Sequence, residues 1–127
     1  LGSKHVVVVH SEDGMDEISI TGKTFIAELK NNKISEYTVD PSLFGLKKGN
    51  LEDIIVTDSE HSKDIILDIL AGNSSVARDI AVLNAGAAIY VSGLTKDINT
   101  GILMAQEKID DGKALNKLNQ LIEASNV

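Results

Sequence analysis

The sequence predicts an α/β fold in which one buried strand and an antiparallel hairpin precede four helices. The evidence is an unbroken run of valines, two short strand-like segments separated by a pair of asparagines, and a second half with apolar residues at helical spacing. One β part followed by four helices cannot cover both faces of a multistranded sheet by itself. We therefore expect the chain to be a fragment whose N-terminal part is missing.

The valine run from Val6 to Val9 predicts a strand buried on both faces, as in a parallel sheet. β-Branched side chains fit the pleat, and a half-solvated strand would alternate apolar and polar residues instead. The segment from His10 to Ser19 then begins at the end of this strand. Ligands of open α/β sheets bind outside the carboxyl ends of the strands, so function is expected in this segment.

Two adjacent carboxylates, Asp16 and Glu17, lie in this segment just after Gly14, which lets the chain turn sharply. Hard cations that prefer oxygen ligands bind such groups. The pair is therefore the candidate metal site. A solvated turn is the alternative for these residues, and the spacing of a calcium-binding EF-hand loop is absent.

Residues 24–30 and 33–39 predict the two strands of a half-exposed hairpin. Asn31 and Asn32 connect them, and asparagine tolerates the positive φ angles of a two-residue turn. Pro41 follows the second strand and cannot donate a hydrogen bond to a ladder. The hairpin is therefore expected to end there.

Three of the helices are predicted from their caps and apolar spacing. The first begins near Ser59 or Ser62 and ends at Gly72, the third follows Asp97 and ends at Gly112, and the fourth begins at once. Their apolar faces are expected to contain Ile65, Ile66, Ile69 and Leu70; Ile98, Ile102, Leu103 and Ile109; and Leu115, Leu118, Leu121 and Ile122.

The second helix, residues 76–91, has no charged residue after Asp79. A helix that is apolar on all sides is buried on all sides, and this one is too short to span a bilayer. Other helices are therefore expected to enclose it, with the small residues from Ala85 to Ala88 allowing a close backbone approach. Asn84 is expected to satisfy a neighbouring backbone group.

Composition excludes several classes of function. A net charge of −7 argues against sequence-independent binding to nucleic acid or an anionic membrane, because both depend on clustered Lys and Arg. The absence of cysteine excludes disulfides and thiolate metal sites and fits a reducing compartment. No apolar run approaches the roughly 20 residues of a transmembrane helix. A cytoplasmic protein is therefore expected.

The remaining ionisable residues of interest are assigned structural roles. His10, beside the acidic segment, is expected to be packed or hydrogen-bonded rather than a ligand, and His5 and His61 are expected at the surface. Arg78 is expected to form a local ion pair with Asp79 rather than to contact a ligand. No catalytic residue is assigned in this chain.

Six segments occur in an order that is informative when they are taken together. They are Val6-Val7-Val8-Val9-His10, Asp13-Gly14-Met15-Asp16-Glu17-Ile18-Ser19, Glu36-Tyr37, Phe44-Gly45-Leu46, Ala77-Arg78-Asp79 and Leu83-Asn84-Ala85-Gly86-Ala87-Ala88-Ile89-Tyr90. In this order they resemble the C-terminal portion of the anthranilate phosphoribosyltransferase family. The resemblance covers nearly the whole chain.

The resemblance implies an α/β domain of the nucleoside phosphorylase and phosphoribosyltransferase type, preceded by a helical domain through which the intact enzyme forms a homodimer. Residues 1–57 would supply the strand, metal loop and hairpin of the α/β domain. Residues 58–93 would supply two helices that pack with the missing helical domain. Residues 94–127 would supply the C-terminal helices of the α/β domain.

The resemblance also implies an enzyme of tryptophan biosynthesis that transfers ribose 5-phosphate from phosphoribosyl pyrophosphate to anthranilate, releasing pyrophosphate. Asp16 and Glu17 match the family's acidic pair, which binds Mg²⁺ at the pyrophosphate. The family's glycine-rich loop and its Lys-His-Gly-Asn-Arg-type segment lie upstream and are not in this sequence, so the chain alone is expected to be inactive. The alternative is a relative of the same fold that is non-catalytic or binds nucleosides or nucleic acid.

Overall fold

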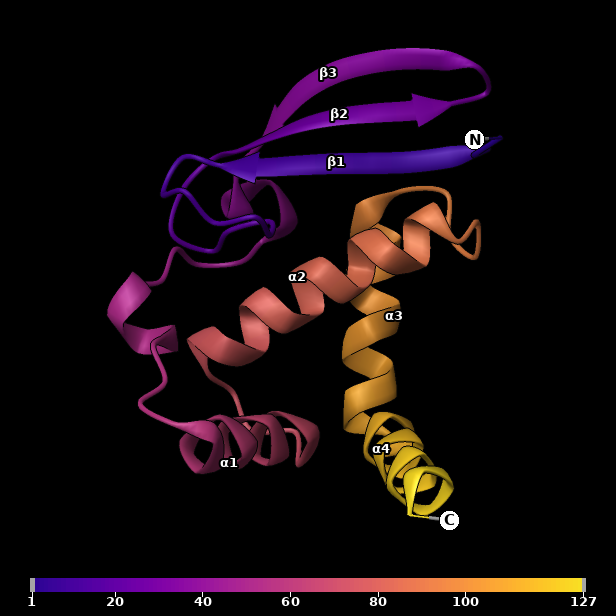
Figure 1. Ribbon diagram of the computed structural model, residues 1–127. Helices are drawn as coiled ribbons and strands as arrows, with labels where there is room; N and C mark the ends of the chain where they lie inside the picture. The colour runs from indigo at the N-terminus through magenta and orange to yellow at the C-terminus, as the bar shows by residue number, and fades with distance from the viewer. Residues whose placement is uncertain (1, 127) are drawn as a thin grey trace.

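The computed structural model describes residues 2–126; residues 1 and 127, which the predicted domain bounds include, lie outside it. In chain order it contains β1 (His5–Ser11), β2 (Thr24–Lys30), β3 (Lys33–Val39), α1 (Ser59–Leu70), α2 (Val76–Val91), α3 (Ile98–Asp110) and α4 (Lys113–Ser125), with short 3-10 helices at Pro41–Phe44 and Leu51–Ile54. The predicted order of a strand, a hairpin and four helices is confirmed. Figure 1 shows the sheet as one layer, with α2 running beneath it and α1 and α4 farther away.

The sheet is antiparallel, in the order β1-β2-β3. β1 pairs with β2 over its whole length, and β2 pairs with β3 in the same way. The predicted hairpin turn is confirmed, because Asn31 and Asn32 have φ angles of 52° and 59°. These positive angles match the twist of the strands that the turn connects.

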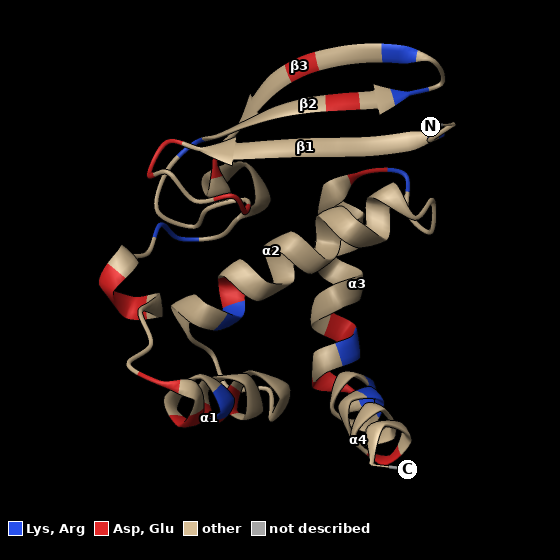
Figure 2. Ribbon diagram, viewed as in Figure 1, with Lys and Arg blue, Asp and Glu red and all other residues tan. Residues whose placement is uncertain are grey.

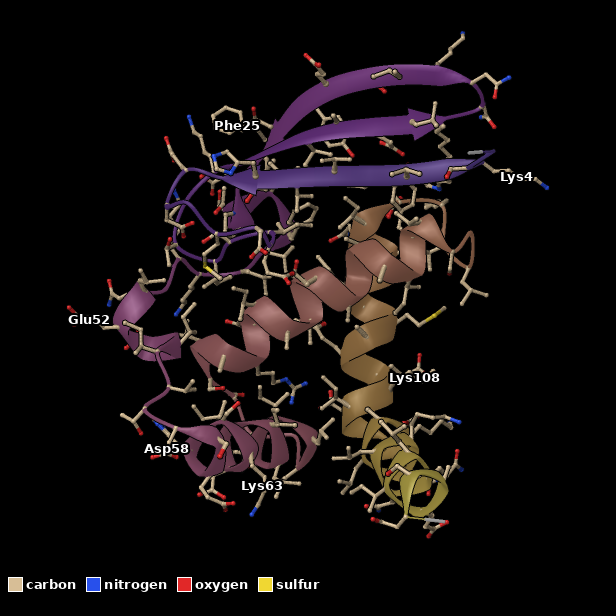
Figure 3. All side chains as sticks on the ribbon, viewed as in Figure 1. Lys4, Phe25, Glu52, Asp58, Lys63 and Lys108 are labelled. Carbon is tan, nitrogen blue, oxygen red and sulfur yellow. The ribbon has the colours of Figure 1, made fainter. Side chains whose placement is uncertain are left out.

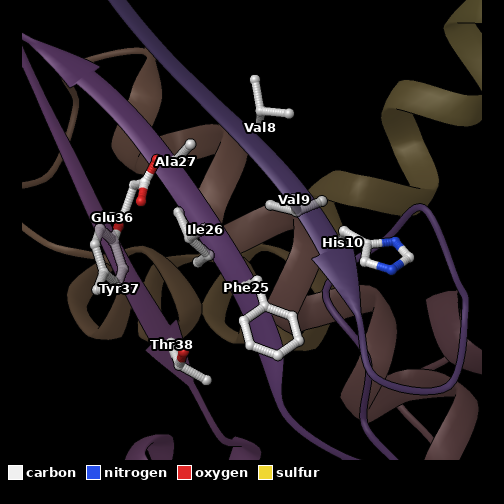
Figure 4. Close-up of a pocket in the computed structure, with 9 residues that line it drawn as sticks. All are labelled: Val8, Val9, His10, Phe25, Ile26, Ala27, Glu36, Tyr37 and Thr38. Atoms are coloured by element: carbon white, nitrogen blue, oxygen red, sulfur yellow. The ribbon is translucent and has the colours of Figure 1, made fainter.

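The prediction that β1 is buried on both faces, as in a parallel sheet, is wrong for residues 2–126, because β1 is paired with the antiparallel β2 and one of its faces is exposed. Val8 is 62% exposed, because no element of residues 2–126 covers the outer face of the sheet. Phe25 and Ile34 are exposed on the same face, and Phe25 points away from the helices (Figure 3). An open hollow of about 440 Å³ lies on this face, lined by side chains that include Val8, Phe25 and Glu36 (Figure 4).

The core lies between the inner face of the sheet and α2. Ile26 of β2 and Ile20 of the preceding loop are buried there, together with Val82 and Leu83 of α2. Burial of each such side chain contributes about 1.5–3 kcal/mol relative to an exposed position. The sheet and α2 therefore form a common support for the loop that joins β1 to β2.

α3 crosses α2 at two glycines. A Cβ atom added to Gly101 would lie 2.2 Å from the carbonyl oxygen of Gly86, and one added to Gly86 would lie 2.6 Å from the backbone nitrogen of Ile102. The close backbone approach expected from the small residues of α2 is therefore confirmed. The prediction that α2 is buried on all sides is wrong, because Ala85 and Ala88 are exposed.

The cap predicted at Asp97 is confirmed, and α1 and α2 begin with side-chain caps of the same kind. The side chains of Asp58, Ser75 and Asp97 each accept a hydrogen bond from a backbone N–H in the first turn of α1, α2 and α3. Gly72 follows α1 with a φ of 90°, a conformation that glycine adopts without strain. Within residues 2–126, no helix has the length and apolar character needed to cross a membrane.

Candidate metal-binding loop

The loop after β1 carries the two candidate metal ligands, and its base is closed by short-range hydrogen bonds. The N–H of Glu12 donates to the carbonyl of Lys23 at 2.9 Å, and the N–H of Lys23 donates to Oε2 of Glu12 at 3.1 Å. The N–H of Ser11 donates to the carbonyl of Met15 at 3.0 Å. Gly14 turns the chain between them with a φ of 89°. The loop therefore begins as a tight turn.

Asp13 ties the two arms of this loop together. One carboxylate oxygen accepts hydrogen bonds from the Ser11 hydroxyl and, at 3.1 Å, from the N–H of Met15. The other accepts from the hydroxyls of Ser19 and Thr21, each at 2.5 Å. Burial alone would raise the pKa of Asp13, but these hydrogen bonds outweigh it and hold the pKa well below its usual range. Sequence reasoning missed this residue, although the flanking hydroxyl residues are a visible signal.

Asn84 of α2 holds the far end of the loop. Its side-chain amide exchanges two hydrogen bonds with the backbone of Ile18, and Nδ2 also donates to the carbonyl of Ile80 at 3.0 Å. The role predicted for Asn84 is confirmed. The residue directly after Glu17 is thereby fixed to the helix that packs on the sheet.

Asp16 and Glu17 lie between these two anchors, and both are exposed. Figure 2 shows acidic residues in this loop, next to a β1 that carries no Lys, Arg, Asp or Glu. Within residues 2–126, no three or more His, Cys, Asp or Glu side chains are grouped to hold a metal ion. Mg²⁺ commonly takes one or two carboxylates from a protein and completes its octahedron with water and phosphate oxygens. The pair therefore fits Mg²⁺ that is shared with a phosphate ligand.

The histidines near β1 lie differently from the prediction. His10 is exposed at the end of β1, beside the hollow of the outer face, rather than packed (Figure 4). His5 is not at the surface, because its Nε2 donates to Oε1 of Glu28 at 2.8 Å and its ring meets Tyr90 edge to face at 4.8 Å. His61 is exposed, as predicted.

Glu28 is the centre of a buried polar cluster that sequence reasoning missed. It also accepts hydrogen bonds from the hydroxyls of Tyr90 at 2.6 Å and Tyr37 at 2.9 Å, and it is 7% exposed. Lys30 donates to the Tyr90 hydroxyl at 3.0 Å. This cluster begins at His5, the opposite end of β1 from the acidic loop, so the two are separate. Strand alternation from the buried Ile26 would have placed Glu28 inward.

Arg78 pairs with Asp110 and not with Asp79, so the predicted local pair is wrong. Its Nη2 donates to Oδ1 of Asp110 at 2.7 Å, and its Nη1 donates to the carbonyl of Gly72 at 2.5 Å. The long side chain reaches past its neighbour in sequence to the ends of two other helices. Arg78 therefore joins α1, α2 and α3 and takes no part in the acidic loop.

Comparison of the chain with known proteins shows its family. The family model described as "Glycosyl transferase family, a/b domain" matches residues 1–115. The anthranilate phosphoribosyltransferase of Methylobacillus flagellatus is 50% identical over 121 residues, which cover 95% of this chain and 36% of that relative. The chain thus spans little more than a third of the length of the curated relatives it matches.

Solved structures of the same enzyme share the fold. The anthranilate phosphoribosyltransferase from Thermus thermophilus has a TM-score of 0.83 and 28% identity, over 91% of this chain and 34% of that one. A variant from Saccharomyces cerevisiae with Mg bound has a TM-score of 0.84 and 25% identity, over 97% of this chain and 36% of that one. The predicted fold class is therefore confirmed. Because the family model covers residues 1–115, the chain belongs to the glycosyl transferase family that has this α/β domain.

Proposed function

We propose that this chain is the metal-carrying C-terminal part of an anthranilate phosphoribosyltransferase. The observation that carries the proposal is the loop after β1, where Asp16 and Glu17 are exposed at the carboxyl end of the strand. Asp13 and Asn84 hold the chain on either side of the pair. Relatives with this name match nearly the whole chain, and one solved relative has Mg bound, which supports the proposal.

In the proposed reaction, the amine of anthranilate bonds to the anomeric carbon of phosphoribosyl pyrophosphate and gives up a proton to solvent water. The bond from that carbon to pyrophosphate breaks, and the electron pair leaves with pyrophosphate. A bound Mg²⁺ would supply positive charge that offsets the negative charge developing on this leaving group. The role of this chain in the reaction is to hold the ion with the carboxylate oxygens of Asp16 and Glu17. Anthranilate presents a neutral amine, so this segment needs no general base.

In this proposal, the remaining substrate contacts are made by the part of the enzyme that corresponds to the rest of the relatives' length, which this chain does not span. The chain alone therefore has no transferase activity. Residues 1–57 and 94–127 belong to the α/β domain, and residues 58–93 pack with a helical domain that makes the intact enzyme a homodimer. The intact enzyme acts in the cytoplasm and binds neither nucleic acid nor membrane.

The test uses a chimera in which this chain replaces the matching part of the Methylobacillus flagellatus relative. Anthranilate consumption is measured against Mg²⁺ and phosphoribosyl pyrophosphate in the chimera and in its Asp16→Asn, Glu17→Gln variant. We expect activity to fall by about 100-fold or more in the variant, because the amides keep the shape of the side chains and lose the charge that holds the ion. The chain alone is assayed in parallel and is expected to be inactive.

The matched control is Glu52→Gln with Asp53→Asn, an exposed acidic pair that removes the same charge elsewhere. It should leave activity and Mg²⁺ dependence unchanged. Undiminished activity in the Asp16, Glu17 variant would make that pair a solvated turn. A folded but inactive wild-type chimera would instead favour a non-catalytic or nucleoside-binding relative of the same fold.

A further inference from the structure

We propose that Asp13 is a positioning residue for the Asp16 and Glu17 pair. This inference rests on the proposed function, because it takes the pair as the Mg²⁺ site. A carboxylate offers about four acceptor positions. In Asp13 each oxygen already accepts two hydrogen bonds from the loop itself. Asp13 is therefore committed to the protein and fastens the loop instead of binding the ion.

The hydroxyl donors to Asp13 come from both arms of the loop. Ser11 is the last residue of β1, whereas Ser19 and Thr21 lie on the arm that returns to β2. Ser11 and Ser19 are fully buried, so their positions are set by the core. Asp13 thus clamps the two arms together across the segment that carries the acidic pair.

The opposite side of the pair is fixed independently by Asn84 through Ile18. The exposed acidic pair therefore lies between two fixed points of the chain, one held by Asp13 within the loop and one held by Asn84 of α2. Ligands that are held in place before binding avoid the entropy cost of ordering them when the ion arrives. Removing Asp13 leaves this end of the segment held by the backbone hydrogen bonds of Ser11 and Glu12 without the side-chain clamp, and the carboxylates must then be ordered at the expense of ion affinity.

Loss of negative charge near the site is a competing explanation for any effect of Asp13, and two variants separate it. Asp13→Ala and Asp13→Asn remove the same charge. The amide of the asparagine variant still accepts from the N–H of Met15 and donates to a hydroxyl oxygen on the returning arm, whereas alanine does neither. The difference between the two variants therefore measures positioning alone.

The first readout is Mn²⁺ binding to the chain itself, followed through the paramagnetic broadening of the amide signals of residues 14–18 and its reversal by excess Mg²⁺. We expect Asp13→Ala to need about tenfold more Mn²⁺ for the same broadening, in the range typical of residues that orient metal ligands. Asp13→Asn should fall between Asp13→Ala and the wild type. Asp58→Ala, which removes a cap carboxylate from α1, is the matched control and should bind Mn²⁺ like the wild type.

The second readout is the chimeric enzyme. A positioning role raises the Mg²⁺ concentration for half-maximal activity of Asp13→Ala by about tenfold and leaves the rate at saturating Mg²⁺ nearly unchanged. A merely structural role lowers the amount of folded enzyme and leaves that Mg²⁺ concentration where it was. The second result would overturn the proposal.

Each remaining outcome also supports or overturns either the positioning role or the proposed metal site. If Asp16→Asn with Glu17→Gln abolishes the broadening but Asp13→Ala does not weaken it, the positioning role fails and the proposed function stands. If the Asp16, Glu17 variant broadens like the wild type, the proposed metal site itself fails. Equal losses in Asp13→Ala and Asp13→Asn would assign the effect to charge. If Asp13→Ala does not fold, Ser19→Ala removes one donor to Asp13, and wild-type Mn²⁺ binding in that variant would overturn the proposal.

Discussion

The side-chain amide of Asn84 pairs with both backbone polar groups of Ile18. The N–H of Ile18 donates to Oδ1 of Asn84 at 2.9 Å, and Nδ2 of Asn84 donates to the carbonyl of Ile18 at 2.9 Å. The two residues are 66 positions apart in the sequence. One polar side chain in the uncharged part of α2 therefore fixes the end of the acidic loop.

Replacing Asn84 by alanine should destabilise the chain. Ile18 is buried, so its N–H and carbonyl would be left without their partner, at a cost of about 2 kcal/mol. The free energy of unfolding in urea measures this loss. Asn116→Ala, at an exposed position of α4, is the control and should change stability by less than about 0.5 kcal/mol. Equal losses in both variants would contradict the role of the amide.

Glu28 should make stability depend on acid pH. Burial alone would raise the pKa of this carboxyl, but hydrogen bonds from Tyr90, Tyr37 and His5 outweigh burial and lower the pKa. A group whose pKa is lowered by folding stabilises the folded state above its unfolded pKa. That contribution is lost as the pH falls through the folded pKa.

We therefore expect Glu28→Gln to lose about 2 kcal/mol of stability at neutral pH, where the charged acceptor is missing. Its free energy of unfolding should also change less than that of the wild type between neutral pH and about pH 3. Urea denaturation at the two pH values measures both effects. Glu36→Gln, exposed on β3, should retain the full pH dependence. A Glu28→Gln variant as acid-sensitive as the wild type would show that the charge of Glu28 is unimportant.

Gly101→Ala should be destabilising although alanine is the better helix former. Propensity alone would favour alanine by about 1 kcal/mol. The added Cβ would lie 2.2 Å from the carbonyl oxygen of Gly86, so the two helix backbones must move apart. We expect a net loss of about 1–3 kcal/mol in thermal or urea unfolding. Ala85→Ser adds one atom at an exposed site of α2 and should be nearly neutral; a Gly101→Ala variant as stable as the wild type would disprove the close crossing.

Arg78→Ala should cost more stability than Asp110→Asn. The side chain of Asp110 is 58% exposed, so its ion pair with Arg78 contributes less than about 1 kcal/mol. Arg78 is 11% exposed and also donates to the carbonyl of Gly72, which raises the expected loss to about 2 kcal/mol. A double-mutant cycle in urea gives both values and their coupling. A larger loss in Asp110→Asn would show that the ion pair dominates.

The local elements could be predicted from the sequence because their signals lie within a few residues. Asn31 and Asn32 form the hairpin turn by their own backbone conformation. The predicted cap at Asp97 accepts a hydrogen bond from an N–H group in the next turn of the chain. Hydrogen bonds between residues so close in the sequence form whatever the rest of the fold is, so they can be predicted locally.

The tertiary partners could not be predicted in the same way. Arg78 pairs with Asp110 rather than with its neighbour Asp79, because the packing of the helices brings the ends of α1 and α3 within reach of its side chain. Glu28 is charged, and its burial becomes favourable only where tyrosine hydroxyls converge on it. The exposure of Val8 depends on what covers the sheet, which the sequence of β1 does not specify. The position of Asp16 and Glu17 beside a strand end was predicted, and their binding of Mg²⁺ stays a prediction.

The length of chain between Ile18 and Asn84 sets the order of events during folding. The hairpin closes through a two-residue turn, whereas the contact between Ile18 and Asn84 closes a loop of 66 residues, and closing a longer loop costs more entropy. We expect β2 and β3 to pair early and the acidic loop to become rigid only after α2 has docked. In pulsed hydrogen exchange during refolding, the amide of Ile18 should gain protection after the amides of the hairpin. A refolding chain therefore has its hairpin before it has an ordered acidic loop.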